Sequence, residues 1–411
     1  MNAMAVLICG AILLSAGFGV YLRLRQIAFV RGHRDETPPD FRDSVTAHEH
    51  QRAADYTVAN AKISIAETLY SAVVSLAWLL FWLAPLYWAV AAATAPGLWR
   101  SLAFVLAFAA IASLLDLPFS LARTFWLDAR FGLNKQSLSG FSLDWLKSSA
   151  LEFALGAPLL LGMFALFAAF PDRWWIFAYV GFMVFVLAMT MVYPNFIAPL
   201  FNTFTPMPRD ALRERLEALL NRCNFAAQNL YVMDASKRST RGNAYFAGFG
   251  KTRRIVLFDT LIAKHSPDEI ESILAHELGH FKFGHIKQSM ALMAAVSLAG
   301  FAVLYWALGP TGLAPAFGFP FEPAIGFVIV LLAREPVMHL LTPVFSWRSR
   351  RAEFEADDFA KAMVGEEPMV SALTRLTRDN LATLTPDRLY AMFYYSHPPV
   401  PERIAHLREA A

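Results

Sequence analysis

Seven long apolar runs dominate the hydrophobic pattern of the chain. A helix needs about 20 residues to cross the roughly 30 Å of hydrocarbon in a membrane. Runs of sufficient length occur near residues 3–22, 67–94, 99–122, 149–170, 174–198, 288–310 and 321–343. The pattern therefore predicts a mainly α-helical, multi-pass membrane protein with seven transmembrane helices.

The basic residues between these runs predict how the helices are oriented. Arg23 and Arg25 directly follow the first run. The loops on the same side of the predicted membrane are rich in Lys and Arg, whereas the alternate junctions hold few. Cytoplasmic loops carry an excess of these residues. We therefore expect the N-terminus outside the cell, and both large polar regions and the C-terminus in the cytoplasm.

The polar segment between the fifth and sixth runs has the pattern of a small α+β domain. Residues 207–222 place their leucines on one side of a helix. Three short stretches that follow are typical of strands, at 229–234, 243–249 and 253–258. Gly250 and Lys251 predict a turn between the last two.

Composition supports a membrane protein and excludes several other classes. The chain of 411 residues is 56% hydrophobic and only 17% charged, which is far from the balance of a soluble domain. A formal net charge of +3 without a basic tract gives no reason to expect a nucleic-acid partner. Cys9 and Cys223 form no Cys-x-x-Cys pair, so we expect no redox chemistry.

The sequence "HELGH" supplies the first candidate chemistry. Ser266 and Pro267 predict the start of a helix, on which His276 and His280 lie about 40° apart and can reach one metal ion. Glu277 lies beside the first histidine and can reach a metal-bound water without ligating the metal. This arrangement is typical of zinc hydrolases, in which the glutamate acts as a general base.

A third protein ligand must come from elsewhere in the chain. The extended metzincin motif is excluded because the chain has Phe283 and Ile286 where glycine and histidine would be needed. His285 would lie about 140° from His280 around a continuous helix, so we expect it to be a polar residue at the membrane edge rather than a ligand.

The stretch "SRRAEFEADDFA" at 349–360, after the seventh run, offers that ligand. Glu353 and Asp357 share one face of the predicted helix. We expect Glu353 to bind zinc and Asp357 to hold the N–H of a ligating histidine. The alternative is a solvated helix with pairs between Arg350 and Glu353 and between Arg351 and Glu355.

These patterns divide the chain into four parts. Residues 1–202 hold spans one to five with cytosolic loops, and residues 203–287 form the cytosolic zinc-protease domain. Residues 288–343 hold spans six and seven. Residues 344–411 form a cytosolic helical part that carries the third zinc ligand.

Several further stretches carry a resemblance to a known family. Together with "HELGH" and "SRRAEFEAD", they resemble the type I CAAX prenyl proteases, membrane zinc metalloproteases of the glutamate-zincin kind. The stretches are "RFGLNKQS", "YPNFIAPLFNTFTPMP", "SKRSTRGNAYF", "RIVLFDTLI" and "YSHPPVPERI". The similarity runs in order along nearly the whole chain.

The resemblance implies seven helices that enclose a chamber, with one Zn²⁺ per chain held by His276, His280 and Glu353. It implies that Asn243 binds substrate, that His397 stabilises the tetrahedral intermediate, and that Arg403 is a nearby orienting residue.

A hydrolytic site also needs a hydrogen-bond donor aimed at the developing oxyanion, which is a separate reason to expect His397 in the site. The alternative for His397 is a turn residue before Pro398 and Pro399.

The substrate is less well defined than the reaction. The chain is compact, which favours a bacterial homologue in the inner membrane, and many bacteria make no prenylated CAAX proteins. The resemblance implies peptide or protein substrates, possibly lipidated, cut near the C-terminus. Because strands directly precede the zinc helix, we expect the peptide to bind along the strands at 243–258 by edge pairing. The alternatives are a quality-control protease for membrane proteins and, outside the enzymes, a transporter or channel with a structural metal site.

Charged residues also occur inside the predicted spans. Arg334 and Glu335 interrupt span seven, and Asp116 and Glu152 lie within or near spans three and four. Such groups are costly in lipid and usually face a cavity or pair with one another. We expect some of them to face water in the chamber, with Arg334 or Glu335 close to the zinc helix.

Overall fold

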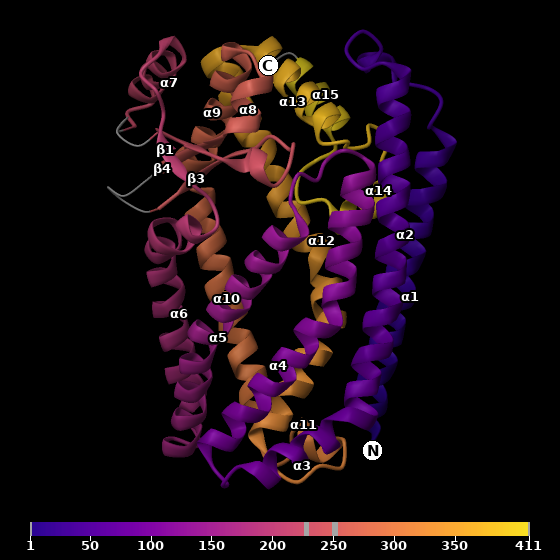
Figure 1. Cartoon of the computed structure of the whole chain (residues 1–411), viewed down its shortest axis with the longest axis vertical. Helices are drawn as coiled ribbons and strands as arrows, with labels where there is room; N and C mark the ends of the chain where they lie inside the picture. The colour runs from indigo at the N-terminus through magenta and orange to yellow at the C-terminus, as the bar shows by residue number, and fades with distance from the viewer. Residues whose placement is uncertain (1, 226–229, 249–253, 410–411) are drawn as a thin grey trace.

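The computed structural model describes residues 2–225, 230–248 and 254–409. The turn expected at Gly250 and Lys251, and the strand ends expected at residues 229, 249 and 253, lie outside the described residues. Long helices extend away from a smaller helical and β-sheet part, which gathers at one end of the molecule (Figure 1).

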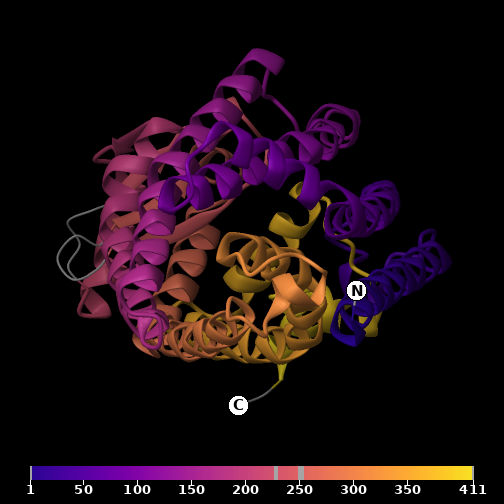
Figure 2. The ribbon, with the colours of Figure 1, turned by 90° about the horizontal axis from the view of Figure 1, so that it is seen from below.

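Seven helices in the described residues are long and apolar enough to cross a membrane, which confirms the number of spans expected. Viewed along the long axis, they form a ring (Figure 2). The helices are α1 (Ala3–Gly32), α2–α3 (Ala47–Ala93), α4 with its continuation (Leu98–Asp128), α5 (Leu138–Ala169), α6 with its continuation (Trp174–Leu200), α10 (His285–Ala307) and α12 (Pro323–Val364).

Helix α12 connects the membrane part to the smaller part. Its 42 residues include Pro336 and Pro343 without interruption, and at about 1.5 Å per residue it is roughly 63 Å long. Glu353 therefore lies on the same rigid element as the seventh span. The helix also runs through position 343, where the sequence patterns divide the membrane part from the C-terminal part.

The smaller part contains a four-stranded sheet in the order β1-β2-β4-β3. Strands β2 (Leu230–Met233), β3 (Ala244–Ala247) and β4 (Arg254–Phe258) fall where strands are expected, and β1 (Phe204–Pro206) is an additional one. β2 and β4 are parallel, whereas β3 pairs antiparallel with β4. Among the described strands β3 is thus an edge strand, and no other described strand pairs with its outer side.

Helices pack around this sheet and form its hydrophobic core. Buried leucines of α7 (Ala211–Arg222) join Ile270 and Leu274 of α9 (Pro267–Lys282). Ser266 caps α9 in a capping box with Glu269, which confirms the expected helix start. The remaining helices are α8 (Asp259–Lys264), α11 (Leu313–Ala316), α13 (Glu366–Asp379), α14 (Arg388–Tyr394) and α15 (Val400–Arg408).

Part of the expectation for the intramembrane charges is wrong. Arg334, Glu335 and Asp116 line a cavity of about 540 Å³ together with Arg23 and Glu67, so they do face a cavity. Glu335 and Glu353 are separated by 353 − 335 = 18 residues of one helix, or about 27 Å. Neither Arg334 nor Glu335 is therefore close to the predicted metal ligands, because the seventh span is a single long helix.

Candidate metal centre

The candidate site lies where helices α9 and α12 approach each other closely. Gly279 faces α12, and a Cβ atom added there would lie 2.9 Å from Cα of Ala356 and 3.2 Å from its carbonyl oxygen. Only a residue without a side chain fits this spacing without movement of a helix. Gly279 and Ala356 therefore allow the "HELGH" helix and the "EFEAD" helix to come into contact.

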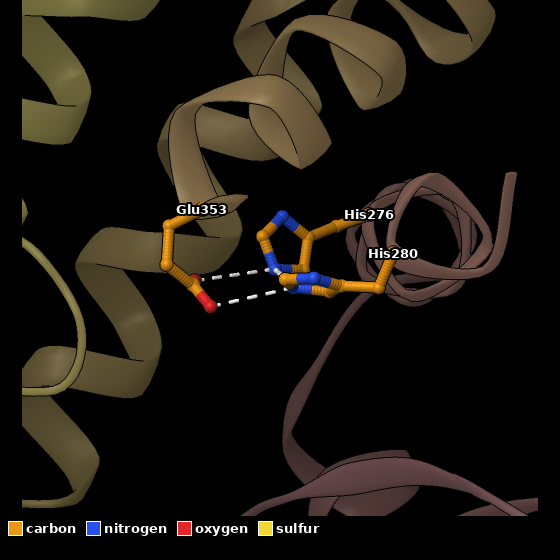
Figure 3. Close-up of side chains that lie close together, drawn as sticks. All are labelled: His276, His280 and Glu353. Carbon is orange, nitrogen blue, oxygen red and sulfur yellow. Dashed lines mark hydrogen bonds and ion pairs between the residues drawn. The ribbon is translucent and has the colours of Figure 1, made fainter. Parts of the chain in front are cut away.

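This contact brings the three predicted ligands together. His276 and His280 point from adjacent turns of α9 toward Glu353 on α12 (Figure 3). Nε2 of His276 lies 3.4 Å from Oε2 of Glu353, and Nε2 of His280 lies 3.3 Å from Oε1. The two Nε2 atoms are 3.2 Å apart.

These side chains fit a metal ion in two independent respects. Zinc with two imidazole nitrogens and a carboxylate oxygen at about 2.0–2.2 Å in a tetrahedron spaces its ligands by roughly 3.4 Å, which agrees with the three distances. Glu353 is only 4% exposed, yet its Oε2 atom has no hydrogen-bond partner among the described residues. A buried carboxylate oxygen normally has a partner, and a metal ion would be one.

Asp357 and Arg403 hold His276 on the side of the ring opposite Glu353. Oδ1 of Asp357 lies 2.8 Å from Nδ1 of His276, which is the contact expected from the sequence. Arg403 donates to both carboxylate oxygens of Asp357 at 2.7 Å and 2.5 Å. Burial alone lowers the pKa of His276, but the neighbouring carboxylates of Asp357 and Glu353 outweigh it and raise the pKa to about 9. The same carboxylates would favour a metal cation in place of that proton.

Glu277 faces open space beside the ligands. It lines a cavity of about 450 Å³ with His280 and with Tyr245 and Phe246 of the edge strand β3. Partial burial raises its pKa above the ordinary value for glutamate, although the two histidines oppose this shift. A carboxylate in a partly dry cavity is a stronger proton acceptor than one in water.

His397 also reaches the site, from the loop after α14. Its Nε2 atom lies 3.4 Å from Oε1 of Glu353, and Ser396 forms a 2.9 Å hydrogen bond with its Nδ1 atom. Arg350 of α12 fixes this loop by donating to the backbone carbonyls of Ala391, Met392 and Tyr395. The sequence alternative for Arg350 was a pair with Glu353; its observed partners are these carbonyls.

Asn243 lies at the start of the edge strand, outside the cluster of ligands. Its side chain is exposed and accepts a 2.9 Å hydrogen bond from the backbone N–H of Ala244, and its carbonyl accepts one from Phe258. No contact recorded for the described residues joins it to the three ligands. Its position beside the free edge of β3 is compatible with contact to a bound peptide.

His285 is the first residue of α10, the sixth candidate span, and is not among the three clustered ligands, as the sequence predicts. The helical angle did not predict that it is buried, with 7% exposed, and bonds to His280 and Glu355. The angle of 140° assumed one continuous helix, but α9 ends at Lys282 and Gly284 has φ 69° before α10 begins. The glycine at 284 was the signal for this break.

Comparisons with known proteins identify the family of this chain. A CAAX prenyl protease N-terminal model with five membrane helices matches residues 26–203, and the model of peptidase family M48 matches residues 206–411. The chain is 33% identical to CAAX prenyl protease 1 of Saccharomyces cerevisiae, over 98% of this chain and 94% of that protein. It is 32% identical to the Arabidopsis thaliana homolog, over 94% and 93%.

A solved structure gives the same result for the fold. The crystal structure of S. mikatae Ste24p matches this structure with a TM-score of 0.93 and 29% sequence identity, and the match covers 100% of both chains. The transporter and channel alternatives are therefore set aside. The chain belongs to the CAAX prenyl protease 1 family of M48 peptidases and is a multi-pass integral membrane metalloprotease.

Proposed function

We propose that this protein is a zinc endopeptidase that binds one Zn²⁺ per chain through His276, His280 and Glu353. The observation that carries the proposal is the trio of ligand atoms, which all lie within 4.8 Å of one another. One of them, a buried oxygen of Glu353, has no hydrogen-bond partner in the described part of the chain. Metalloproteases of peptidase family M48 generally use zinc, and two histidines with one glutamate are a common catalytic zinc set.

The residues of this chain divide the work of peptide hydrolysis. When bound, zinc supplies Lewis acidity, which lowers the pKa of a water and polarises the scissile carbonyl. Glu277 accepts the proton of the attacking water and returns it to the leaving amine. His397 donates a hydrogen bond to the developing oxyanion. Asp357, held by Arg403, keeps the proton of His276 on Nδ1 so that Nε2 is free to bind the metal.

The substrate is proposed to be a peptide with a prenylated cysteine near its C-terminus, as the names of the relatives imply for those proteins. The peptide would add to the free edge of β3, with Asn243 at one end of the strand. Beyond Tyr245 and Phe246 a cavity of about 740 Å³ reaches α6. Its mainly apolar wall would suit the lipid.

The orientation proposed for the protein places the N-terminus outside the cell, and the metal centre and C-terminus on the cytoplasmic side. The excess of Lys and Arg in the loops on the side of the metal centre supports this orientation. The compact chain supports a bacterial inner membrane as its location.

A peptide assay with the purified full-length protein tests the proposal. The wild type is expected to hold one zinc per chain and to cut a farnesylated C-terminal peptide faster than the same peptide without the lipid. Glu277→Gln should keep the zinc and lose most cleavage, whereas Glu214→Gln, at an exposed position of α7, should behave as wild type. Equal cleavage by wild type and Glu277→Gln would refute the mechanism. Equal rates on both peptides would refute the lipidated substrate.

A further inference from the structure

His285 and Glu355 extend the hydrogen bonding of the metal centre beyond the three proposed ligands. The Nδ1 atoms of His280 and His285 lie 3.0 Å apart. Nε2 of His285 lies 3.0 Å from Oε2 of Glu355 on α12. The break in the helix at Gly284, with φ 69°, places the His285 ring beside His280, a position that a continuous helix could not provide.

The direction of these hydrogen bonds follows from the chemistry of imidazole. A bond between two ring nitrogens needs one protonated and one bare nitrogen. Nε2 of His280 faces Glu353 and His276, so it is the atom available to a metal. A metal-bound neutral imidazole carries its proton on the other nitrogen, here Nδ1. His280 then donates to Nδ1 of His285, and His285 donates from Nε2 to Glu355.

We propose that His285 and Glu355 are positioning residues that hold His280 in the tautomer and ring orientation required for metal binding. This inference rests on the proposed zinc site. Asp357 does the same for His276 directly, at 2.8 Å, whereas Nδ1 of His280 contacts His285, which in turn contacts Glu355. Both sets of hydrogen bonds end at carboxylates of α12, at positions two residues apart.

The surroundings of Glu355 fit this role. Oε1 of Glu355 lies 3.4 Å from Arg351 on the same helix, while its other carboxylate oxygen, Oε2, faces His285. The side chain is 41% exposed and lines a cavity of about 660 Å³ between α10 and α12. Replacement of Glu355 therefore leaves little unfilled core, so a loss of metal would not simply report misfolding.

Zinc affinity, measured by competition with a chelator on the purified full-length protein, tests the inference. Hydrogen bonds to ligating histidines typically change metal affinity about 10–100-fold. His285→Phe keeps the ring but cannot accept or donate, and we expect zinc affinity to fall about 10-fold or more. His285→Gln retains an acceptor and a donor and should lose less. Glu355→Ala should lose affinity in the same direction, and His48→Phe, at an exposed position of α2, should match wild type.

The outcomes separate this inference from the proposed function. Wild-type zinc affinity in both His285→Phe and Glu355→Ala, with zinc lost in His276→Ala, would overturn the positioning role and leave the zinc site intact. A wild type that binds no zinc would overturn the proposed function itself. If His285→Phe does not fold, as judged by size-exclusion chromatography and thermal unfolding of the metal-free protein, Glu355→Ala decides.

Discussion

His397 differs from the other polar residues of the metal centre because most of its side chain is exposed. Its exposed fraction is 62%, compared with 8% for His276 and 5% for Glu353. A buried ligand is held in place before substrate arrives, whereas an exposed donor can contact a group that forms during the reaction. The structure thus favours an interaction made mainly in the transition state.

His397→Gln is therefore expected to lower kcat about 10²–10³-fold, the cost of losing one donor to an oxyanion, with little change in KM or zinc content. Steady-state kinetics with zinc analysis checks this, with His48→Gln as the matched control. A raised KM with an unchanged kcat would instead assign His397 to substrate binding.

At the scale of elements, the site depends on the close approach of α9 and α12. Neither helix holds a complete site, since α9 supplies two nitrogens and α12 supplies the carboxylate. The contact at Gly279 sets the distance between them, and Arg350 ties α12 to the end of α14, which precedes His397. Substitutions at these two positions test the packing without altering any proposed ligand.

Gly279→Ala places a Cβ atom 2.9 Å from Cα of Ala356, so the helices must separate. We expect a loss of about 1–3 kcal/mol of stability, as for other overpacked cores, and weaker zinc binding because Glu353 moves away from the histidines. Thermal unfolding and zinc competition measure both effects. Gly300→Ala on α10 is the control, since an added Cβ there meets nothing within 4 Å. Unchanged zinc affinity in Gly279→Ala would contradict the argument.

Arg350→Met removes the donor that satisfies three carbonyl groups at the end of α14. The carbonyl of Ala391 also accepts from the N–H of Tyr395, but Arg350 is the side chain that holds the carbonyls of Met392 and Tyr395, so the loop that carries His397 should lose order. We expect kcat to fall by about 10-fold, the loss that about 1.4 kcal/mol of transition-state stabilisation produces, with zinc retained. Arg388→Met, at an exposed position on the first turn of α14, should leave kcat at the wild-type value. A result in which both variants lose kcat equally would point to a general effect on α14.

At the scale of the whole molecule, a membrane part and a smaller sheet-containing part share one helix, α12. The smaller part also contains buried carboxylates outside the metal centre, among them Glu269, which is 2% exposed. It caps α9, accepts from Ser371 at 2.6 Å and pairs with Arg375 at 3.0 Å. Burial alone would raise the pKa of Glu269, but Ser371, the N–H of Ser266 and the charge of Arg375 together lower it below the ordinary value.

Stability should therefore depend on pH through Glu269. A lowered folded-state pKa contributes stability that is complete above the unfolded-state value of about 4.3 and is lost as the pH falls through the folded-state pKa. Glu269→Gln should destabilise the protein by about 1–3 kcal/mol near pH 7, as for bonds to charged groups. The difference in Tm from wild type should shrink below about pH 4.3. A difference independent of pH would exclude the carboxylate charge as its cause.

The sequence alone determined the local features of this protein. The seven membrane-spanning helices can be recognised from the sequence, because a helix in the hydrocarbon of a membrane must be apolar along its whole length. His276, His280 and Glu277 were predictable because a helical period places them on one face. Glu353 and Asp357 followed from the same period and from the need for a third ligand.

Tertiary structure decided how separate segments meet. The pairing of α9 with α12, the loop that brings His397 to Glu353, and the role of Arg350 all join residues far apart in the chain, and periodicity within one segment carries no information about such contacts. The contact between His285 and His280 was not predictable for a related reason. A single positive φ at Gly284 redirects the chain between two helices, and this turn, invisible to a helical count, places the buried ring of His285 beside His280.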